Sequence, residues 1–132
     1  MARPRQPHPT PAELEVLQVL WRLGPCSVRQ VRQALNQQPP RAYTTVMSLL
    51  NIMADKGLVR RRAQGRAFVY SARADRETTL GGILGDVVKR AFDGSAGALV
   101  ARLLAQSRPD PDELDEIRKV IAAYRRRRGK RP

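Results

Sequence analysis

The chain has 132 residues and a formal net charge of +13 at pH 7, which suits one compact domain or a small domain with an appendage. Its single cysteine excludes an intramolecular disulfide and a cysteine-rich metal site, and no apolar run reaches the roughly 18 residues of a membrane span. The first segment, MARPRQPHPTP, lacks the apolar core of a secretion signal, so we expect a cytoplasmic protein in which residues 1–9 form a flexible basic arm.

Two helix signals follow the arm. In TPAELEVLQVLWRLGP, Thr10 can act as the N-cap with Glu13 as its capping-box partner, and Gly24 followed by proline ends the helix. The inward face expected for this helix consists of Leu14, Leu17, Leu20 and Trp21. Ser27 can cap the next helix, VRQVRQAL, with Gln30 as its capping-box partner, and NQQPP breaks this helix. The sequence therefore predicts two short helices separated by a tight turn.

The segment RAYTTVMSLLN predicts a third helix, which ends at Gly57. Apolar residues recur in it at i, i+3, i+4 and i+7, the spacing of a stripe that faces a core: Val46, Leu49, Leu50 and Met53. The following segment, LVRRRAQGRAFVYS, predicts a strand that begins at Leu58 and a return strand over 67–70, joined by a turn at AQG. Three helices followed by a two-stranded hairpin are typical of a winged helix-turn-helix.

The outward face of the third helix carries short polar groups where a solvated helix usually carries charges. A helical wheel puts Thr44, Ser48 and Asn51 opposite the apolar stripe. Hydroxyl and amide groups can bond base edges and cations can bind phosphate, whereas carboxylates would be repelled by DNA. Residues 1–73 hold 12 Lys and Arg against 3 Asp and Glu, a net charge of +9. We expect the following residues to contact double-stranded DNA: Arg41, Tyr43, Thr44, Thr45, Ser48, Asn51, Lys56, Arg61 and Arg66.

Some of these assignments leave an alternative open. Tyr43 lies between the apolar stripe and the outward face, so both packing and a hydrogen bond to phosphate are open for it. Strand alternation sends Arg60 and Arg62 to one face of the hairpin and Arg61 to the other, so not all of them can reach phosphate. The alternative for this cluster is a solvated edge where cations discourage strand pairing. Arg66, beside the turn glycine, is our first choice for a phosphate contact.

The second half of the chain predicts three amphipathic helices. Asp75 and Asp110 can cap the first and the last of them, and glycine and serine separate the first two. Three such stripes are hard to bury within one short chain, so we expect them to pack against a second copy. The residues expected in this interface are apolar ones at helical spacing: Leu80, Ile83, Leu84, Val87, Val88, Phe92, Leu99, Leu103, Leu114, Ile117, Ile121 and Tyr124.

The fold class that follows is mostly α with a small β-hairpin wing. We predict a winged-helix DNA-binding domain over residues 10–73 and a helical dimerisation domain over residues 74–124. Residues 125–132 hold six cations and no anion, and we expect them to form a basic, disordered tail. Contact with neighbouring phosphates and a solubilising role are both open for this tail. Dimerisation would place two third helices on one side of DNA, about one helical turn apart.

Three segments together resemble the penicillinase-repressor family, to which the repressors BlaI, MecI and CopY belong. They are PAELEVLQVLWRLGPCSVRQV, YTTVMSLLNIMADKGLVRR and RAFVYSA, in this order. The resemblance covers roughly residues 10–124 and implies a homodimeric winged-helix repressor of a dyad operator. The operators of this family lie in promoters of resistance, copper-homeostasis or similar stress-response genes. The resemblance assigns Thr44, Thr45 and Ser48 to the recognition helix and Arg66 to the wing.

Two departures from the family pattern limit what the resemblance implies. Copper-responsive members carry paired cysteines near the C-terminus, and this chain has none there, which argues against metal sensing. Penicillinase repressors are cleaved at an Asn-Phe bond by a partner sensor protease, and the matching pair here is Arg102-Leu103. The changed residues weaken the expectation of a sensor protease as a partner.

Other classes of function fit the sequence less well. A nonspecific, nucleoid-like nucleic-acid-binding protein would share the positive charge, and a small-molecule-sensing winged-helix regulator would need convergent polar groups among the back helices. We expect no enzyme, cofactor or metal site, because one histidine and one cysteine form no triad and no P-loop or HExxH motif occurs. Cys26 can be a redox thiol at a helix start or a small buried apolar residue.

Overall fold

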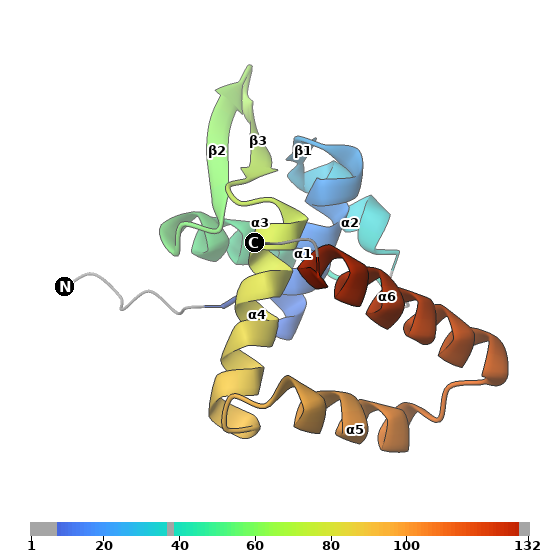
Figure 1. Cartoon of the computed structure of the whole chain (residues 1–132). Helices are drawn as coiled ribbons and strands as arrows, with labels where there is room; N and C mark the ends of the chain where they lie inside the picture. Colours follow the sequence, from blue (N-terminus) through green and yellow to red (C-terminus); the bar gives the residue numbers. More distant parts are fainter. Residues whose placement is uncertain (1–7, 37–38, 130–132) are drawn as a thin grey trace. The chain divides into compact units, whose positions relative to one another are not determined.

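A computed structural model describes residues 8–36 and 39–129 of the chain (Figure 1). The predicted arm at 1–9 therefore lies outside the described residues except at its last two positions. Contacts within the chain divide it into two units, residues 1–85 and 86–132. The first unit reaches further along the chain than the domain predicted for residues 10–73, because the division falls inside the helix α4 (Arg76–Ala91).

Both capping boxes predicted at the start of the chain are present. In α1 (Pro11–Leu23) the Thr10 side chain accepts a hydrogen bond from the Glu13 backbone, and the Glu13 side chain accepts one from Thr10 N. Ser27 and Gln30 form the same reciprocal pair at α2 (Val28–Leu35). Gly24, at φ 82°, closes α1 with its N–H on Leu20 O. Each cap satisfies backbone groups that a helix end leaves unpaired.

In the described part of the chain three strands make the sheet, one more than the sequence predicted. They are β1 (Cys26–Ser27), β2 (Val59–Gln64) and β3 (Ala67–Ala72), in the antiparallel order β1-β3-β2. The two-residue strand β1 is too short to leave an alternating pattern, and it is identified only by its pairing with β3 at Tyr70 and Val69. The turn end of the β2–β3 hairpin extends past the short strand β1 (Figure 1), and Val59 is the only buried residue of β2.

The core of the first unit lies between α1, α2, α3 (Tyr43–Asp55) and the base of the sheet. Among residues 8–36 and 39–129, twelve buried residues form it: Val16, Leu17, Val19, Leu20, Cys26, Val28, Val31, Val46, Leu50, Met53, Val59 and Tyr70. The inward face of α1 is rotated from the predicted one, with Glu13 and Val16 buried and Leu14 and Trp21 only half-buried. The burial of Glu13 is tolerated because its carboxylate forms the ion pair with Lys56 described below.

The second half of the chain is helical, as predicted. It contains α4, α5 (Ala96–Ser107) and α6 (Pro111–Gly129), and none of the three carries a buried residue. Asp75 and Asp110 accept hydrogen bonds from Thr78 N and Glu113 N, as N-caps do. The tail predicted as disordered from residue 125 is instead helical up to residue 129, because arginine is a good helix former and cations favour a helix C-terminus. Residues 130–132 lie outside the described residues.

Candidate nucleic-acid interface

The face of α3 that points away from the core is open, and its one carboxylate is the exposed Asp55 at the C-terminal end of the helix. On its inner side Val46, Leu50 and Met53 are all fully buried, while Thr44, Thr45 and Ser48 on the outer side are exposed. A groove of about 500 Å³ runs along this outer side, lined by Ala12, Arg41, Thr44, Thr45, Ser48, Leu49 and Ile52. Its polar groups are three hydroxyls and one guanidinium, which can hydrogen-bond base edges and phosphate.

Arg41 is held just before the start of α3 by two neighbours. Its guanidinium lies 3.4 Å from Glu15 Oε2, with 27% of the Arg41 side chain exposed. Its backbone carbonyl accepts a 2.6 Å hydrogen bond from Arg32 Nε. Because α3 begins at Tyr43 after an alanine that offers no side-chain cap, these contacts fix the approach to the helix. Tyr43 itself is 48% exposed and does not pack in the core.

Asn51 joins α3 to the sheet instead of lying free on the outer face. Its Oδ1 accepts a 2.8 Å hydrogen bond from the Tyr70 hydroxyl and a 3.0 Å hydrogen bond from Arg61 Nη1. The Arg61 guanidinium also lies over the Phe68 ring, 4.6 Å from its centroid, a cation–π contact. Asn51 and Arg61 therefore link α3 to the hairpin.

Lys56 is engaged in the core rather than with solvent. Its Nζ lies 2.8 Å from Glu13 Oε2, and the two side chains are 13% and 2% exposed. Burial raises the pKa of Glu13, but hydrogen bonds from Lys56 and Thr10 and the charge of Lys56 outweigh burial and leave this pKa below its ordinary value. The pair ties the end of α3 to the start of α1, so we leave Lys56 out of the proposed phosphate contacts.

The hairpin of β2 and β3 carries exposed cations, both along β2 and beside its turn. Gly65, at φ 63°, makes the turn between β2 and β3, and Arg66 follows it with its side chain exposed. Arg60 and Arg62 pair with Ser71 and Val69 in the register of the hairpin. They lie on the face opposite Arg61, as strand alternation predicted.

The structure thus brings together part of the predicted site. Arg41, Thr44, Thr45 and Ser48 share one groove, while Asn51, Arg61 and Lys56 serve contacts within the protein. Ile52 and Ala12 also line the groove and were missed. For Ile52 a signal existed in the sequence, since it follows Ser48 by four residues and is an apolar residue on the polar face.

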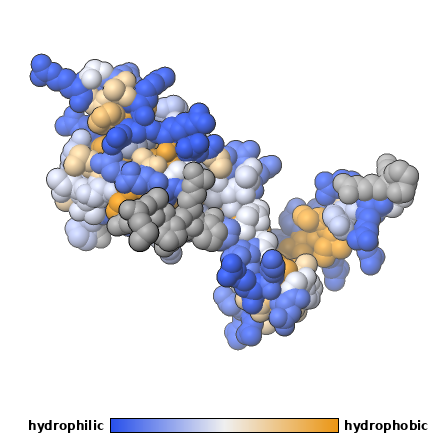
Figure 2. Space-filling model, turned by 90° about the vertical axis from the view of Figure 1, so that its left-hand side faces the viewer, coloured by the Kyte–Doolittle hydropathy of each residue, from blue (hydrophilic) through white to orange (hydrophobic). Residues whose placement is uncertain are grey.

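A second surface is the set of apolar side chains on the back helices. Every residue predicted for the dimer interface is at least partly exposed in the single chain, for example Leu84 at 55% and Tyr124 at 54%. Apolar side chains are open to view on the C-terminal part in Figure 2. Apolar stripes left uncovered on three helices mark a surface that binds another apolar surface.

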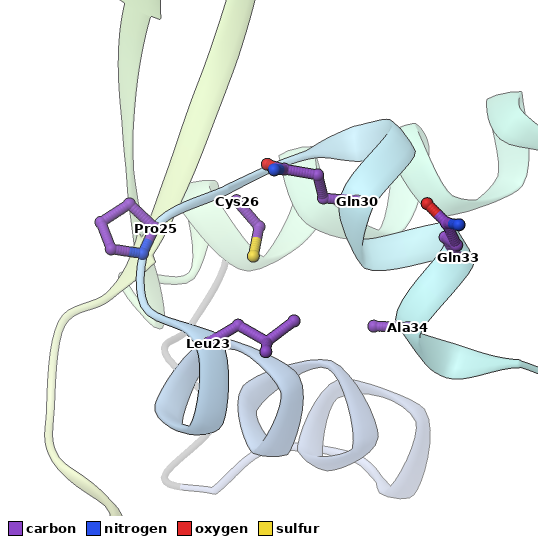
Figure 3. A pocket seen from close by; sticks show the side chains of 6 residues that line it. All are labelled: Leu23, Pro25, Cys26, Gln30, Gln33 and Ala34. Atoms are coloured by element: carbon purple, nitrogen blue, oxygen red, sulfur yellow. The ribbon is translucent and has the colours of Figure 1, made fainter.

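Cys26 lies at a small pocket of the first unit (Figure 3). The pocket has a volume of about 370 Å³ and is lined by Leu23, Pro25, Cys26, Gln30, Gln33 and Ala34. The thiol donates to Gly24 O at 3.3 Å, and Cys26 is 3% exposed. Burial raises the pKa of the Cys26 thiol, which disfavours the reactive thiolate. This environment fits a small buried apolar residue better than a redox thiol.

Metal-binding clusters and membrane-spanning helices are both absent from residues 8–36 and 39–129. Within these ranges no cluster of three or more His, Cys, Asp or Glu side chains could hold a metal ion. The same residues contain no helix that is long and apolar enough to cross a membrane.

Comparison with known proteins identifies the family. The profile described as penicillinase repressor matches residues 9–123. The transcriptional regulator BlaI of Mycobacterium tuberculosis is 35% identical over 122 residues, covering 91% of this chain and 87% of that protein. The penicillinase repressor of Bacillus licheniformis is 22% identical, covering 92% and 95%.

A solved structure supports the fold. The crystal structure of a probable transcriptional regulator from Pseudomonas aeruginosa covers 88% of this chain and 78% of its own, with 20% identity and a TM-score of 0.51. The predicted fold class, mostly helical with a small antiparallel sheet, is confirmed. With a family profile that spans most of its length, the chain belongs to the penicillinase repressor family.

Proposed function

We propose that the protein is a homodimeric transcriptional repressor that binds a dyad operator in double-stranded DNA. The observation that carries the proposal is the open, carboxylate-free groove on α3, in which Arg41, Thr44, Thr45 and Ser48 lie together. A helix-turn-helix protein inserts this helix into the major groove, where hydroxyls read base edges and cations bind phosphate. The names of the two relatives, a transcriptional regulator and a penicillinase repressor, agree with this role.

We assign the wing and the back helices to supporting tasks. Arg66 at the hairpin turn reaches phosphate beside the groove, and Tyr43 donates to phosphate at the start of α3. The exposed stripes of α4, α5 and α6 hold two copies together. Promoters of resistance or stress-response genes are the targets we propose, and binding rather than catalysis is the activity.

The test separates base contacts from phosphate contacts. Thr45→Ala should cost on the order of 1–3 kcal/mol of binding free energy with the operator and little with other duplexes. Arg66→Ala should weaken binding to every duplex and reduce the salt slope by about one. Footprinting on the promoter of the protein's own gene and its neighbours supplies the operator. If both variants lose affinity equally for all sequences, the proposed division of labour fails.

A competition assay tests the proposal against nonspecific coating of nucleic acid. The charge of +13 alone would support tight but sequence-blind binding. A repressor prefers its operator over random duplex by about a thousandfold or more. A preference below tenfold at physiological salt would favour the nonspecific protein.

A further inference from the structure

The helix α6 divides its charges by sign along its length. Residues 110–116, which include its N-cap, contain five carboxylates and no cation. Residues 118–128 contain six cations and no carboxylate. In contrast, α5 contains a single charged residue, Arg102, and α4 carries both signs of charge at each of its ends. Among the described helices of the back half, α6 is therefore the one whose charges could determine which helix pairs with it and whether the pair is parallel or antiparallel.

The apolar stripe of α6 has a symmetric spacing. Leu114, Ile117, Ile121 and Tyr124 are separated by three, four and three residues, which is a heptad pattern. Reversing the order of the four residues gives the same spacing, with a centre near residue 119. None of the four is buried, and Ile121 and Tyr124 are 50% and 54% exposed.

We propose that α6 pairs with α6 of a second copy in an antiparallel arrangement centred near Lys119. This inference rests on the proposed homodimer and adds its register and direction. Antiparallel pairing brings Leu114 opposite Tyr124 and Ile117 opposite Ile121, so the whole stripe is covered. Parallel pairing would cover the same stripe and would bring Glu113 beside Arg118 of the second copy, but it would place the two acidic N-terminal halves side by side and the two arginine-rich C-terminal halves side by side.

One edge of the stripe shows the charge match most clearly. Glu113, Val120 and Arg127 are spaced by seven residues and follow the same edge of the helix. In the antiparallel register, Glu113 lies beside Arg127 of the second copy. Val120, which is 67% exposed, lies beside Val120 of the second copy. A groove along this edge is lined by Val120, Ala123, Arg126 and Arg127.

Two further charged positions of α6 can be accommodated in this register. Glu116 is already bound to Lys119 within the helix, at 3.1 Å. On the other edge, Arg118 lies near Arg118 of the second copy, close to the two-fold axis of the proposed dimer. Both arginine side chains are long enough to keep their charges in solvent.

Distances between spin labels test the register directly. Asp112, Lys119 and Arg126 are exposed, spaced by seven residues and lie on the face of α6 opposite the stripe. Each is replaced by cysteine in the full chain with Cys26→Ser and labelled, and the distance within the dimer is measured by pulsed electron resonance. We expect the shortest distance at position 119 and longer, equal distances at positions 112 and 126. The latter pairs are offset by about 21 Å along the helix axis, at 1.5 Å per residue.

Charge reversal provides an independent test. Glu113→Arg and Arg127→Glu should each weaken the dimer about tenfold or more in sedimentation at low salt, because two attractions become two repulsions. The double variant should return to within about threefold of the parent dimer. Asp112→Arg is the matched control: it makes the same charge change on the outer face and should leave the dimer unchanged. High salt should reduce all these differences.

The outcomes separate the two proposals. A dimer with equal label distances at all three positions, or one in which the double variant is weaker than both single variants, would overturn the antiparallel register and leave the homodimer standing. A chain that stays monomeric at all concentrations would overturn both.

Discussion

The ion pair between Lys56 and Glu13 leads to a prediction that separates a structural lysine from a DNA-contacting one. Replacement by Lys56→Met removes the cation and leaves a carboxylate that is 2% exposed. Breaking a buried pair from one side costs about 3–5 kcal/mol. Because the Lys56 side chain keeps 13% of its surface in solvent, we expect the lower end of this range, about 3 kcal/mol.

Urea unfolding at fixed protein concentration measures this loss. The single tryptophan, Trp21, donates its indole N–H to Ala74 O at 2.9 Å and reports the first unit by fluorescence. The double variant Glu13→Gln, Lys56→Met removes both charges while glutamine can still accept from Thr10 N. We expect it to be more stable than Lys56→Met by about 2 kcal/mol, since no unpaired charge is left in the core.

The pH dependence follows from the direction of the pKa shift. The pKa of Glu13 in the folded state lies below the ordinary 4.5. The pair therefore contributes fully to stability above that value, and its contribution is lost as the pH falls through the lower, folded pKa. In Lys56→Met the remaining carboxyl is buried without a cation, so its pKa rises and the stability difference from the parent shrinks in acid.

Arg41 supplies the matched control on the surface. Its contact with Glu15 is 3.4 Å long and both side chains are partly exposed, so Arg41→Met should change stability by less than about 0.5 kcal/mol. Arg41→Met should also weaken DNA binding. Lys56→Met, measured under conditions where it is still folded, should show the same salt dependence of DNA binding as the parent protein. If Lys56→Met left stability unchanged and reduced the salt slope by one, Lys56 would be a phosphate contact and our assignment would be wrong.

The remaining predictions concern the wing and the back helices. Asn51→Ala should lower stability by about 1–3 kcal/mol in urea unfolding, because the buried Tyr70 hydroxyl loses its acceptor. Asn51→Asp keeps an acceptor there, so most of this stability should return, and unchanged unfolding in both variants would contradict the assigned contact. Gly65→Ala should destabilise the protein by about 1 kcal/mol because alanine disfavours a φ of 63°. Gly81→Ala, in open space on α4, should stabilise by about 0.5–1 kcal/mol. A weaker dimer in sedimentation with Gly81→Ala would instead show that the glycine permits close helix packing.

Local signals in the sequence were sufficient for the helices and their caps. Thr10 and Ser27 are followed at the third position by Glu13 and Gln30, and this chemistry acts within four residues, so the pattern determines the local structure. The short strand β1 could not be predicted, because its two residues are a strand only through pairing with Tyr70 and Val69 far along the chain.

The site was predictable in part for the same reason. The residues of α3 that share the outer groove follow from helical periodicity, which places Thr44 and Ser48 on one face. The partners of Asn51 and Lys56 lie in other elements, at 19 and 43 residues' separation. A helical wheel shows the direction of a side chain but not its partner, so both residues resembled free polar groups in the sequence.

The distribution of buried residues predicts how the two parts respond to dilution. All twelve core residues belong to α1, α2, α3 and the three strands, whereas α5 and α6, with 12 and 19 residues, contain none. An isolated helix of such length is marginal in water without a packed face. Below the dissociation constant of the dimer, circular dichroism should therefore show a loss of helix while the Trp21 fluorescence stays that of the folded unit. If helix content did not change with concentration down to the monomer, α5 and α6 would be stable without the second copy, and the need for the dimer to cover their stripes would disappear.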